Sequence, residues 1–239
     1  MKWILLPGFD GTGMLFAPLL RALPQEVEPV VVAYPSDRIC SARELVEIVL
    51  AHLPHGGPFV LIAESFSGPI ALNAAARHPV TPVGVVLCAS FAHCPRSRLL
   101  IAILKLCRTI LIGSPPRWMV QRYLTGDAPE EVVALFYRAI GAVNPHVLTG
   151  RFSVLLEFDE DFVPSALKCP LLYLQAGGDR LVKPGNFEIV QRCYSETHFQ
   201  KIDSPHLILQ LQPQASVRVI SEFLARLRPA APDAITKTG

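Results

Sequence analysis

The sequence predicts an α/β fold: a doubly wound, mostly parallel sheet of about six strands, with a helical insertion. Short apolar runs rich in β-branched residues alternate with longer amphipathic segments along the chain. This repeating order is typical of parallel sheets with right-handed crossovers. The apolar runs are continuous rather than alternating, as expected for strands that are buried on both faces. The order is interrupted once, between about residues 95 and 165, where helical patterns follow one another without a convincing strand.

The individual elements follow from this pattern in chain order. The predicted strands comprise residues 3–6, 29–33, 59–63, 83–88, 171–175 and 198–202. The predicted helices of the core comprise residues 14–22, 41–53, 67–77, 186–192 and 213–227. The resulting division is a core of residues 1–94 and 166–228, a helical cap of residues 95–165 and a flexible tail of residues 229–239. Because ligands bind at the carboxyl ends of the strands in such folds, we expect the cap to cover a site there.

Composition narrows the classes of function. The 239 residues are 51% hydrophobic with a formal net charge of +2, which is typical of one globular domain and gives no basis for nucleic-acid binding. The six cysteines form no C-x-x-C pair and no zinc-like cluster with histidine, so no metal site is expected. The longest apolar stretch, residues 99–112, is too short to span a bilayer. The N-terminal apolar run ends at Pro7, too early for a signal peptide. We therefore expect a cytoplasmic protein without a membrane span.

A buried strand runs into a tight turn and a small-residue helix within residues 60–71, V-L-I-A-E-S-F-S-G-P-I-A. This is the context of a nucleophile elbow, in which a strained turn presents a serine hydroxyl above the strand ends. Ser65 would stand at the tip of the elbow. Its neighbours Ala63 and Ser67 are small, as the close approach of strand and helix requires. The alternative is an ordinary turn in which Ser65 and Ser67 cap the following helix.

Two further polar residues follow later strands. Asp179 comes just after the fifth predicted strand, and His206 comes just after the sixth. A nucleophilic serine needs a base, and the base needs an orienting carboxylate. The order Ser65, Asp179, His206, each beyond the end of a strand, supplies all three. Asp203 is an alternative acid because it lies three residues before His206. A solvent-exposed His206 without a role is the alternative for the base.

The turn after the first predicted strand, residues 7–13, is rich in glycine. Such a turn could direct the backbone N–H of Phe9 toward the same point as that of Phe66, giving two donors for a tetrahedral oxyanion. Two other glycine motifs are excluded. A dinucleotide fingerprint would need a third glycine, and a phosphatase motif of the haloacid-dehalogenase type would need aspartate where Gly8 stands.

These motifs resemble those of the α/β-hydrolases, in the capped, carboxylesterase-like branch similar to pimeloyl-carrier-protein methyl ester esterases. The resemblance extends from residue 3 to about residue 227. It rests on Pro-Gly-Phe-Asp-Gly-Thr-Gly, Ala-Glu-Ser-Phe-Ser-Gly, Gly-Gly-Asp-Arg-Leu-Val and Ser-Pro-His-Leu. Two positions depart from the family pattern without removing a reacting group, because Pro7 replaces a histidine and Ala63 replaces a glycine. The family's two antiparallel edge strands are expected to be missing, since the oxyanion turn follows the first strand.

The resemblance implies that Ser65 is the nucleophile, His206 the base and Asp179 the orienting acid, with Phe9 and Phe66 as oxyanion donors. Related dehalogenases and epoxide hydrolases have aspartate at the elbow. A serine there implies hydrolysis of carboxylic esters with short to medium acyl groups through an acyl-enzyme, without a metal or organic cofactor. The alternatives are a thioesterase or acyltransferase acting on carrier-linked acyl groups, and a catalytically silent binding protein.

Charges are segregated within the predicted cap. Residues 95–125 carry six basic residues and no acid, whereas residues 126–165 carry seven acids and only Arg138 and Arg151 as basic residues. One interpretation is that the two halves are solvated faces that neutralise each other. The other is that the basic half attracts an anionic partner, an acyl-carrier protein or a coenzyme A thioester, while residues 99–112 line the acyl entrance. The partner expected from the sequence is a small-molecule acyl ester, with an acyl-carrier protein or a coenzyme A thioester as the alternative.

Overall fold

The computed structural model describes residues 1–94, 115–159 and 161–227. Its six-stranded sheet has the order β2-β1-β3-β4-β5-β6, and every neighbouring pair of strands is parallel. The strands are β1 (Lys2–Leu6), β2 (Glu28–Val31), β3 (Phe59–Glu64), β4 (Gly84–Cys88), β5 (Leu171–Ala176) and β6 (Thr197–Ile202). The predicted parallel sheet is confirmed, and the observed bounds lie within two residues of the predicted ones.

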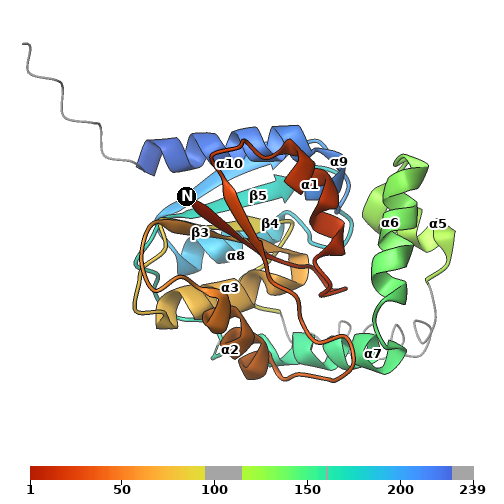
Figure 1. Ribbon diagram of the computed structural model, residues 1–239, viewed down its shortest axis with the longest axis horizontal. Coiled ribbons are helices and arrows are strands. Elements are labelled where there is room, and N and C mark those ends of the chain that lie inside the picture. The colour runs from red at the N-terminus through yellow and green to blue at the C-terminus, as the bar shows by residue number, and fades with distance from the viewer. Residues whose placement is uncertain (95–114, 160, 228–239) are drawn as a thin grey trace, which may run out of the picture.

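Helices cover both faces of the sheet (Figure 1). One face is covered by α2 (Ala42–His52), α3 (Gly68–Arg77) and α8 (Gly185–Cys193). The other is covered by α1 (Ala17–Ala22), α9 (Ile208–Leu211) and α10 (Pro213–Leu227). Single turns, η1 (Met14–Phe16) and η2 (Ser65–Ser67), lead into α1 and α3. The doubly wound arrangement agrees with the prediction, and α9 is an addition that the periodicity does not predict.

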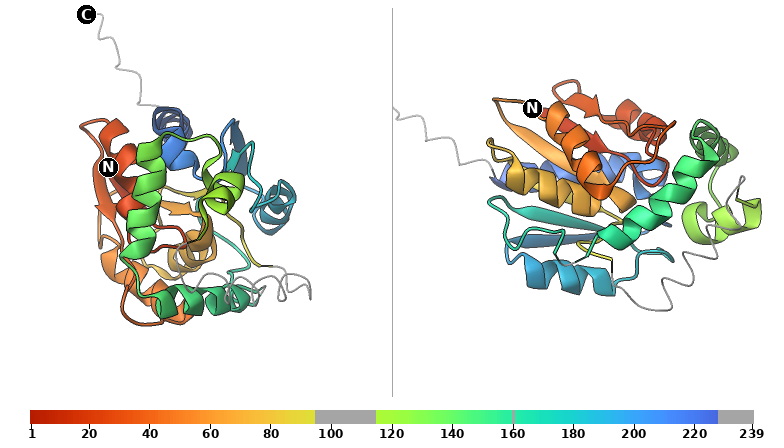
Figure 2. Two further views of the ribbon diagram at one scale, coloured as in Figure 1. Left: turned by 90° about the vertical axis from the view of Figure 1, so that its right-hand side faces the viewer. Right: turned by 90° about the horizontal axis from the view of Figure 1, so that it is seen from below.

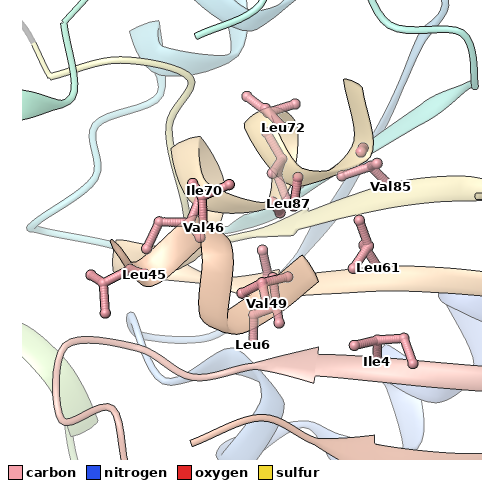
Figure 3. Close-up of a cluster of buried hydrophobic side chains, with 14 of the residues drawn as sticks. Ile4, Leu6, Leu45, Val46, Val49, Leu61, Ile70, Leu72, Val85 and Leu87 are labelled. Carbon is pink, nitrogen blue, oxygen red and sulfur yellow. The ribbon is translucent and has the colours of Figure 1, made fainter. Parts of the chain in front are cut away.

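Alternate residues of the central strands face opposite layers, as the pleat of a strand requires. Ile4 and Leu6 of β1 belong to a cluster that includes Val49 of α2 (Figure 3). Trp3 and Leu5 of the same strand belong to a second cluster, together with residues of α1 and α10. Because both faces are covered, β1, β3, β4 and β5 are apolar at nearly every position, which explains the continuous runs in the sequence.

The two edge strands do not fit that expectation. β2 and β6 lie at the ends of the sheet. Two of the four residues of β2 and four of the six residues of β6 are exposed. The prediction that these two strands are buried on both faces is therefore wrong. The helical layers cover the centre of the sheet more completely than its edges, so the polar residues of an edge strand can remain in water.

The described part of the segment between β4 and β5 is helical, and residues 115–159 contain no strand. Its elements, named here the insertion helices, are α5 (Arg117–Val120), η3 (Gln121–Thr125), α6 (Glu130–Gly141), α7 (Pro145–Val154) and η4 (Leu155–Glu157). α5 and α6 lie beyond the carboxyl ends of the strands (Figures 1 and 2). Their Val120 and Phe136 pack against Leu15 and Leu207 of the core. The predicted acyl entrance, residues 99–112, and the predicted tail lie outside the described residues.

No single helix in the described part of the chain has the length and hydropathy needed to cross a bilayer. One bent pair, Glu130–Gly141 with Pro145–Glu157, meets the length and composition criteria only when both helices are taken together, and they are inclined at 91° to each other.

Candidate active site

Two loops meet where the strand order of the sheet reverses. β1 and β3 are neighbours, with β2 on one side of them and β4 on the other. Ligands in doubly wound sheets bind outside the carboxyl ends of the strands at such a point. The glycine-rich turn of residues 7–13 follows β1, and Ser65 follows β3 directly. The fold therefore brings the two motifs predicted from the sequence to the same edge of the sheet.

Ser65 has a strained backbone. Its φ is +47°, and Ala89 is the only other non-glycine residue in the described ranges with a positive φ. For an L-residue this left-handed conformation costs on the order of 1–2 kcal/mol. Strain of this kind is concentrated at functional sites. The elbow is also tightly packed, since a Cβ added to Gly68 would clash with Ser90 Oγ.

The interpretation of Ser65 and Ser67 as helix caps is wrong. Neither Glu64, the N-cap residue of η2, nor Ser67, the N-cap residue of α3, makes a side-chain capping hydrogen bond. Ser65 Oγ contacts His206. The fully buried Ser67 Oγ donates a hydrogen bond to the carbonyl oxygen of Pro7 and lies 2.6 Å from the Tyr34 hydroxyl. The Ser67 side chain therefore links the turn after β1 to the elbow by a hydrogen bond.

His206 connects Ser65 to Asp179. Its Nε2 lies 2.9 Å from Ser65 Oγ, and its Nδ1 lies 2.7 Å from Asp179 Oδ2. An ionised carboxylate only accepts hydrogen bonds, so Nδ1 carries the proton and Nε2 is left to accept one from the Ser65 hydroxyl. The His206 side chain is 3% exposed, which contradicts the alternative of a solvent-exposed loop histidine. The structure thus brings together the three residues that the sequence singles out.

The carboxylate beside the histidine belongs to Asp179 and not to Asp203. The second oxygen of Asp179, Oδ1, accepts hydrogen bonds from the backbone N–H groups of Leu181 at 2.8 Å and Val182 at 3.0 Å. These two bonds fix the plane of the carboxylate while its other oxygen faces the imidazole. Asp203 is exposed to solvent. Of the two candidate acids, Asp179 is therefore the one whose carboxylate contacts His206.

Phe9 and Phe66 lie side by side. Their rings meet edge to face, with centroids 5.9 Å apart and an interplanar angle of 89°. Phe66 follows Ser65 in the elbow, and Phe9 stands in the middle of the turn after β1. The two residues predicted to supply the oxyanion donors thus come from adjacent segments, and the role of their N–H groups remains a prediction.

A model of the α/β hydrolase family matches residues 3–220. The chain belongs to the α/β hydrolase family. A thermophilic esterase from Thermogutta terrifontis, solved with malate bound, is similar at 20% identity with a TM-score of 0.79, over 96% of this chain and 91% of the esterase. The enol-lactonase from Burkholderia xenovorans LB400 is similar at 15% identity with a TM-score of 0.78, over 94% and 91%. MenH from S. aureus is similar at 12% identity with a TM-score of 0.75, over 96% and 95%. No curated protein sequence matches.

In this α/β hydrolase the residue before Ser65 is a buried carboxyl group that the sequence pattern does not single out. Glu64 is 1% exposed, and its Oε2 accepts a hydrogen bond of 3.2 Å from Gln210 Nε2, while Oε1 has no hydrogen-bond partner among the residues that the structure describes. Burial, and after it the charge of Asp10, raises the pKa of Glu64 to about 7. The hydrogen bond from Gln210 and the proximity of His206 oppose this increase. The only feature of the sequence that could indicate this residue is a single charged side chain at the end of an otherwise apolar strand.

The buried Glu64 is expected to make the stability of this α/β hydrolase fall as pH rises. Its pKa is higher in the folded protein than in the unfolded chain, so folding favours the protonated form, and this contribution is lost as pH rises from about 4.5 through about 7. Glu64→Gln keeps the shape and an acceptor for Gln210 but cannot ionise. We expect the free energy of unfolding of the variant, relative to that of the wild type, to be higher at pH 8 than at pH 5 by up to about 3 kcal/mol.

Denaturant unfolding at pH 5 and pH 8 measures this difference. The exposed Glu188 of α8 offers a matched control, because Glu188→Gln removes the same charge at the surface. A difference between Glu64→Gln and the wild type that is the same at both pH values would contradict the expected ionisation of Glu64.

Arg151 is a second residue whose place the pattern does not reveal, because in the sequence it counts only among the charges of the insertion. In the structure it is 4% exposed and donates hydrogen bonds to the turn after β1. Its partners in the turn, Phe9 and Asp10, lie 142 and 141 positions earlier in the chain. No local pattern in the sequence of an α/β hydrolase can connect residues so far apart.

Proposed function

We propose that this α/β hydrolase is a serine hydrolase that cleaves carboxylic esters of short to medium acyl chain through an acyl-enzyme. The observation that carries the proposal is the unbroken chain of hydrogen bonds from Asp179 through His206 to Ser65. A strained elbow and a base within hydrogen-bond reach are the two properties expected of an activated serine. The fold that the protein shares with an esterase and an enol-lactonase supports the same chemistry.

In the first half of the proposed reaction, Ser65 Oγ attacks the ester carbonyl carbon while His206 Nε2 takes the hydroxyl proton. Asp179 stabilises the imidazolium that forms. The carbonyl oxygen becomes an oxyanion, and the N–H groups of Phe9 and Phe66 would donate hydrogen bonds to it. When the tetrahedral intermediate collapses, the bond to the alcohol oxygen breaks and the alcohol leaves with the proton from His206.

In the second half, water attacks the carbonyl carbon of the acyl-enzyme. His206 takes a proton from the water, a second tetrahedral intermediate forms, and its collapse breaks the bond to Ser65 Oγ. Ser65 recovers its proton from His206, and the carboxylic acid leaves. One water is consumed for each ester, and the reaction needs no other reactant.

Labelling with a fluorophosphonate tests the proposal directly. We expect one label for each chain, located on Ser65 by peptide mass spectrometry, and loss of ester hydrolysis in proportion to labelling. A series of p-nitrophenyl esters from acetate to octanoate would then give the acyl preference. A protein that neither reacts with the phosphonate nor hydrolyses any ester would be a binding protein. Transfer of most acyl groups to an added alcohol, instead of release as free acid, would identify an acyltransferase.

Carrier-linked acyl groups are a second candidate class of substrate, favoured by the segregated charges of the insertion. Among the described basic residues of that segment, Arg117 donates a 3.0 Å hydrogen bond to Glu130, and Arg122 lies 5.7 Å from the centre of the Tyr123 ring. The ion pair of Arg117 with Glu130 links the basic half of the insertion to its acidic half. For Arg117, this agrees with the interpretation that the two halves neutralise each other. Arg96, Arg98, Lys105 and Arg108 lie outside the described residues.

Salt dependence separates the two classes. For a carrier-linked acyl thioester, kcat/KM is expected to fall with added salt, because the Debye length decreases from about 10 Å at 0.1 M to about 3 Å at 1 M. The double variant Arg96→Glu with Arg98→Glu should lower it in the same way. A small neutral ester serves as the control and should change little. If salt and charge reversal affect both substrates equally, the basic segment does not recruit a carrier.

A further inference from the structure

Arg151 brings a buried positive charge to the turn after β1. Its Nη1 donates a 2.9 Å hydrogen bond to the carbonyl oxygen of Phe9 and a second hydrogen bond to that of Asp10. Its Nη2 donates a 2.9 Å hydrogen bond to the carbonyl oxygen of Pro35. One guanidinium group of α7 therefore binds three backbone carbonyls on two loops of the core.

The surroundings of this guanidinium are closely fitted. A Cβ on Gly11 would lie 2.6 Å from Arg151 Nη2, and Gly11 has a φ of +69°, so both the space and the backbone conformation require glycine there. Burial lowers the pKa of Arg151, and the charge of the buried Asp10 opposes this effect. A buried charge is tolerated only when it is hydrogen-bonded or paired. Arg151 meets the first of these conditions through its three backbone carbonyl partners.

The turn is held at several points between Pro7 and Gly11. Ser67 binds the carbonyl of Pro7, and the N–H of Tyr34 donates a 2.7 Å hydrogen bond to the carbonyl of Gly11. The Gly8–Phe9 peptide unit, which carries the N–H of Phe9, lies between these points, and its carbonyl accepts a 3.1 Å hydrogen bond from the N–H of Gly11. Arg151 binds the middle of the turn, and the ring of Phe152, the next residue of α7, lies 4.5 Å from the ring of Phe9.

We propose that Arg151 is a positioning residue for the oxyanion turn: by binding the carbonyls of Phe9 and Asp10, it sets the direction of the Phe9 N–H. This inference rests on the proposed esterase function. Arg151 does not contact the reacting atoms and acts through the backbone of the turn. Its effect should therefore be small on substrate binding and large on the tetrahedral intermediates, where charge develops on the carbonyl oxygen.

Lysine cannot replace the guanidinium in this role. A planar fork with five fixed donors can bind three carbonyls in different directions, whereas an ammonium group is a compact point charge on a flexible stem. Arg151→Lys keeps the positive charge and much of the buried stem, so it is the variant most suited to separate orientation from simple charge. Arg151→Ala removes the whole group and leaves a space that free guanidinium ion can enter.

The test measures kcat and KM for a p-nitrophenyl ester, together with the inhibition constant of a boronic acid that forms a tetrahedral adduct with Ser65. We expect both Arg151 variants to lower kcat by about 10- to 100-fold, the effect of a small misplacement in a site, with KM changed less than about twofold. The boronic acid should bind more weakly by a similar factor, and a non-denaturing concentration of guanidinium chloride should restore part of the kcat of Arg151→Ala. Circular dichroism and Tm give the folded fraction, and Arg138→Ala, at an exposed position of α6, is the matched control.

The outcomes separate this inference from the proposed function. A wild-type protein that hydrolyses no ester overturns both. An active wild type with Arg151→Lys at full kcat for each folded molecule and unchanged boronic acid affinity overturns the role of Arg151 alone. A lower Tm without a change in those two quantities also overturns that role, because it shows that Arg151 only stabilises the fold. Loss of kcat with parallel loss of boronic acid affinity, and rescue by guanidinium but not by sodium chloride, supports the inference.

Discussion

Ser65→Ala is expected to lower kcat for ester hydrolysis by about 10⁴- to 10⁶-fold, because the group that forms the acyl-enzyme is absent and only binding and oxyanion stabilisation remain. Alanine at this position keeps the same Cβ and the same φ of +47°, so the elbow and the fold should be retained. Steady-state kinetics with a p-nitrophenyl ester measures the loss, and circular dichroism confirms the fold.

Ser67→Ala is the matched control, since the two serines are two residues apart on the same elbow. The Ser67 hydroxyl binds Pro7 and Tyr34, whereas the hydroxyl beside His206 is that of Ser65. Removal of the Ser67 hydroxyl leaves the buried Pro7 carbonyl and Tyr34 hydroxyl without this partner. It should reduce the free energy of unfolding by about 1–3 kcal/mol, with a far smaller effect on kcat than Ser65→Ala. An inactive Ser67→Ala beside an active Ser65→Ala would show that the nucleophile has been assigned to the wrong serine.

Asp179→Asn is expected to reduce kcat by up to about 10⁴-fold. The asparagine amide can present an N–H to His206 Nδ1, which favours the tautomer with its proton on Nε2 and removes the acceptor for the Ser65 proton. Asp203→Asn provides the comparison, because Asp203 is exposed and Asp179 occupies the position beside the imidazole. Kinetics of both variants should be measured with their Tm values. Equal losses of activity from two folded variants would contradict the assignment of Asp179.

The parts of the fold that depend on local pattern could be predicted. Strands β1, β3, β4 and β5 are apolar because both of their faces are covered, and their limits follow from the glycine, proline and polar residues that flank them. The exposure of β6 could not be predicted, because the local sequence determines that a segment forms a strand but does not determine whether that strand lies at the edge of the sheet. Its sequence, T-H-F-Q-K-I, has strand propensity, but the sheet order that leaves it at an edge arises from the whole chain.

The same distinction applies to the candidate site. Ser65, Asp179 and His206 each follow a strand, and parallel strands place their carboxyl ends together, so their proximity follows from local positions. Glu64 and Arg151 gain their importance from burial and from partners far along the chain, which no spacing within one segment reveals.

The pairing of β4 with β5 has a consequence for the synthesis of the protein. The strands are neighbours in the sheet, yet the complete insertion separates them in the sequence. While the ribosome makes the insertion, β4 presents an unpaired edge on which every side chain is apolar or small, and such edges pair readily with other chains. Contacts between residues that are distant in the sequence also slow folding. The interval before β5 emerges is therefore when we expect this chain to be most prone to aggregation.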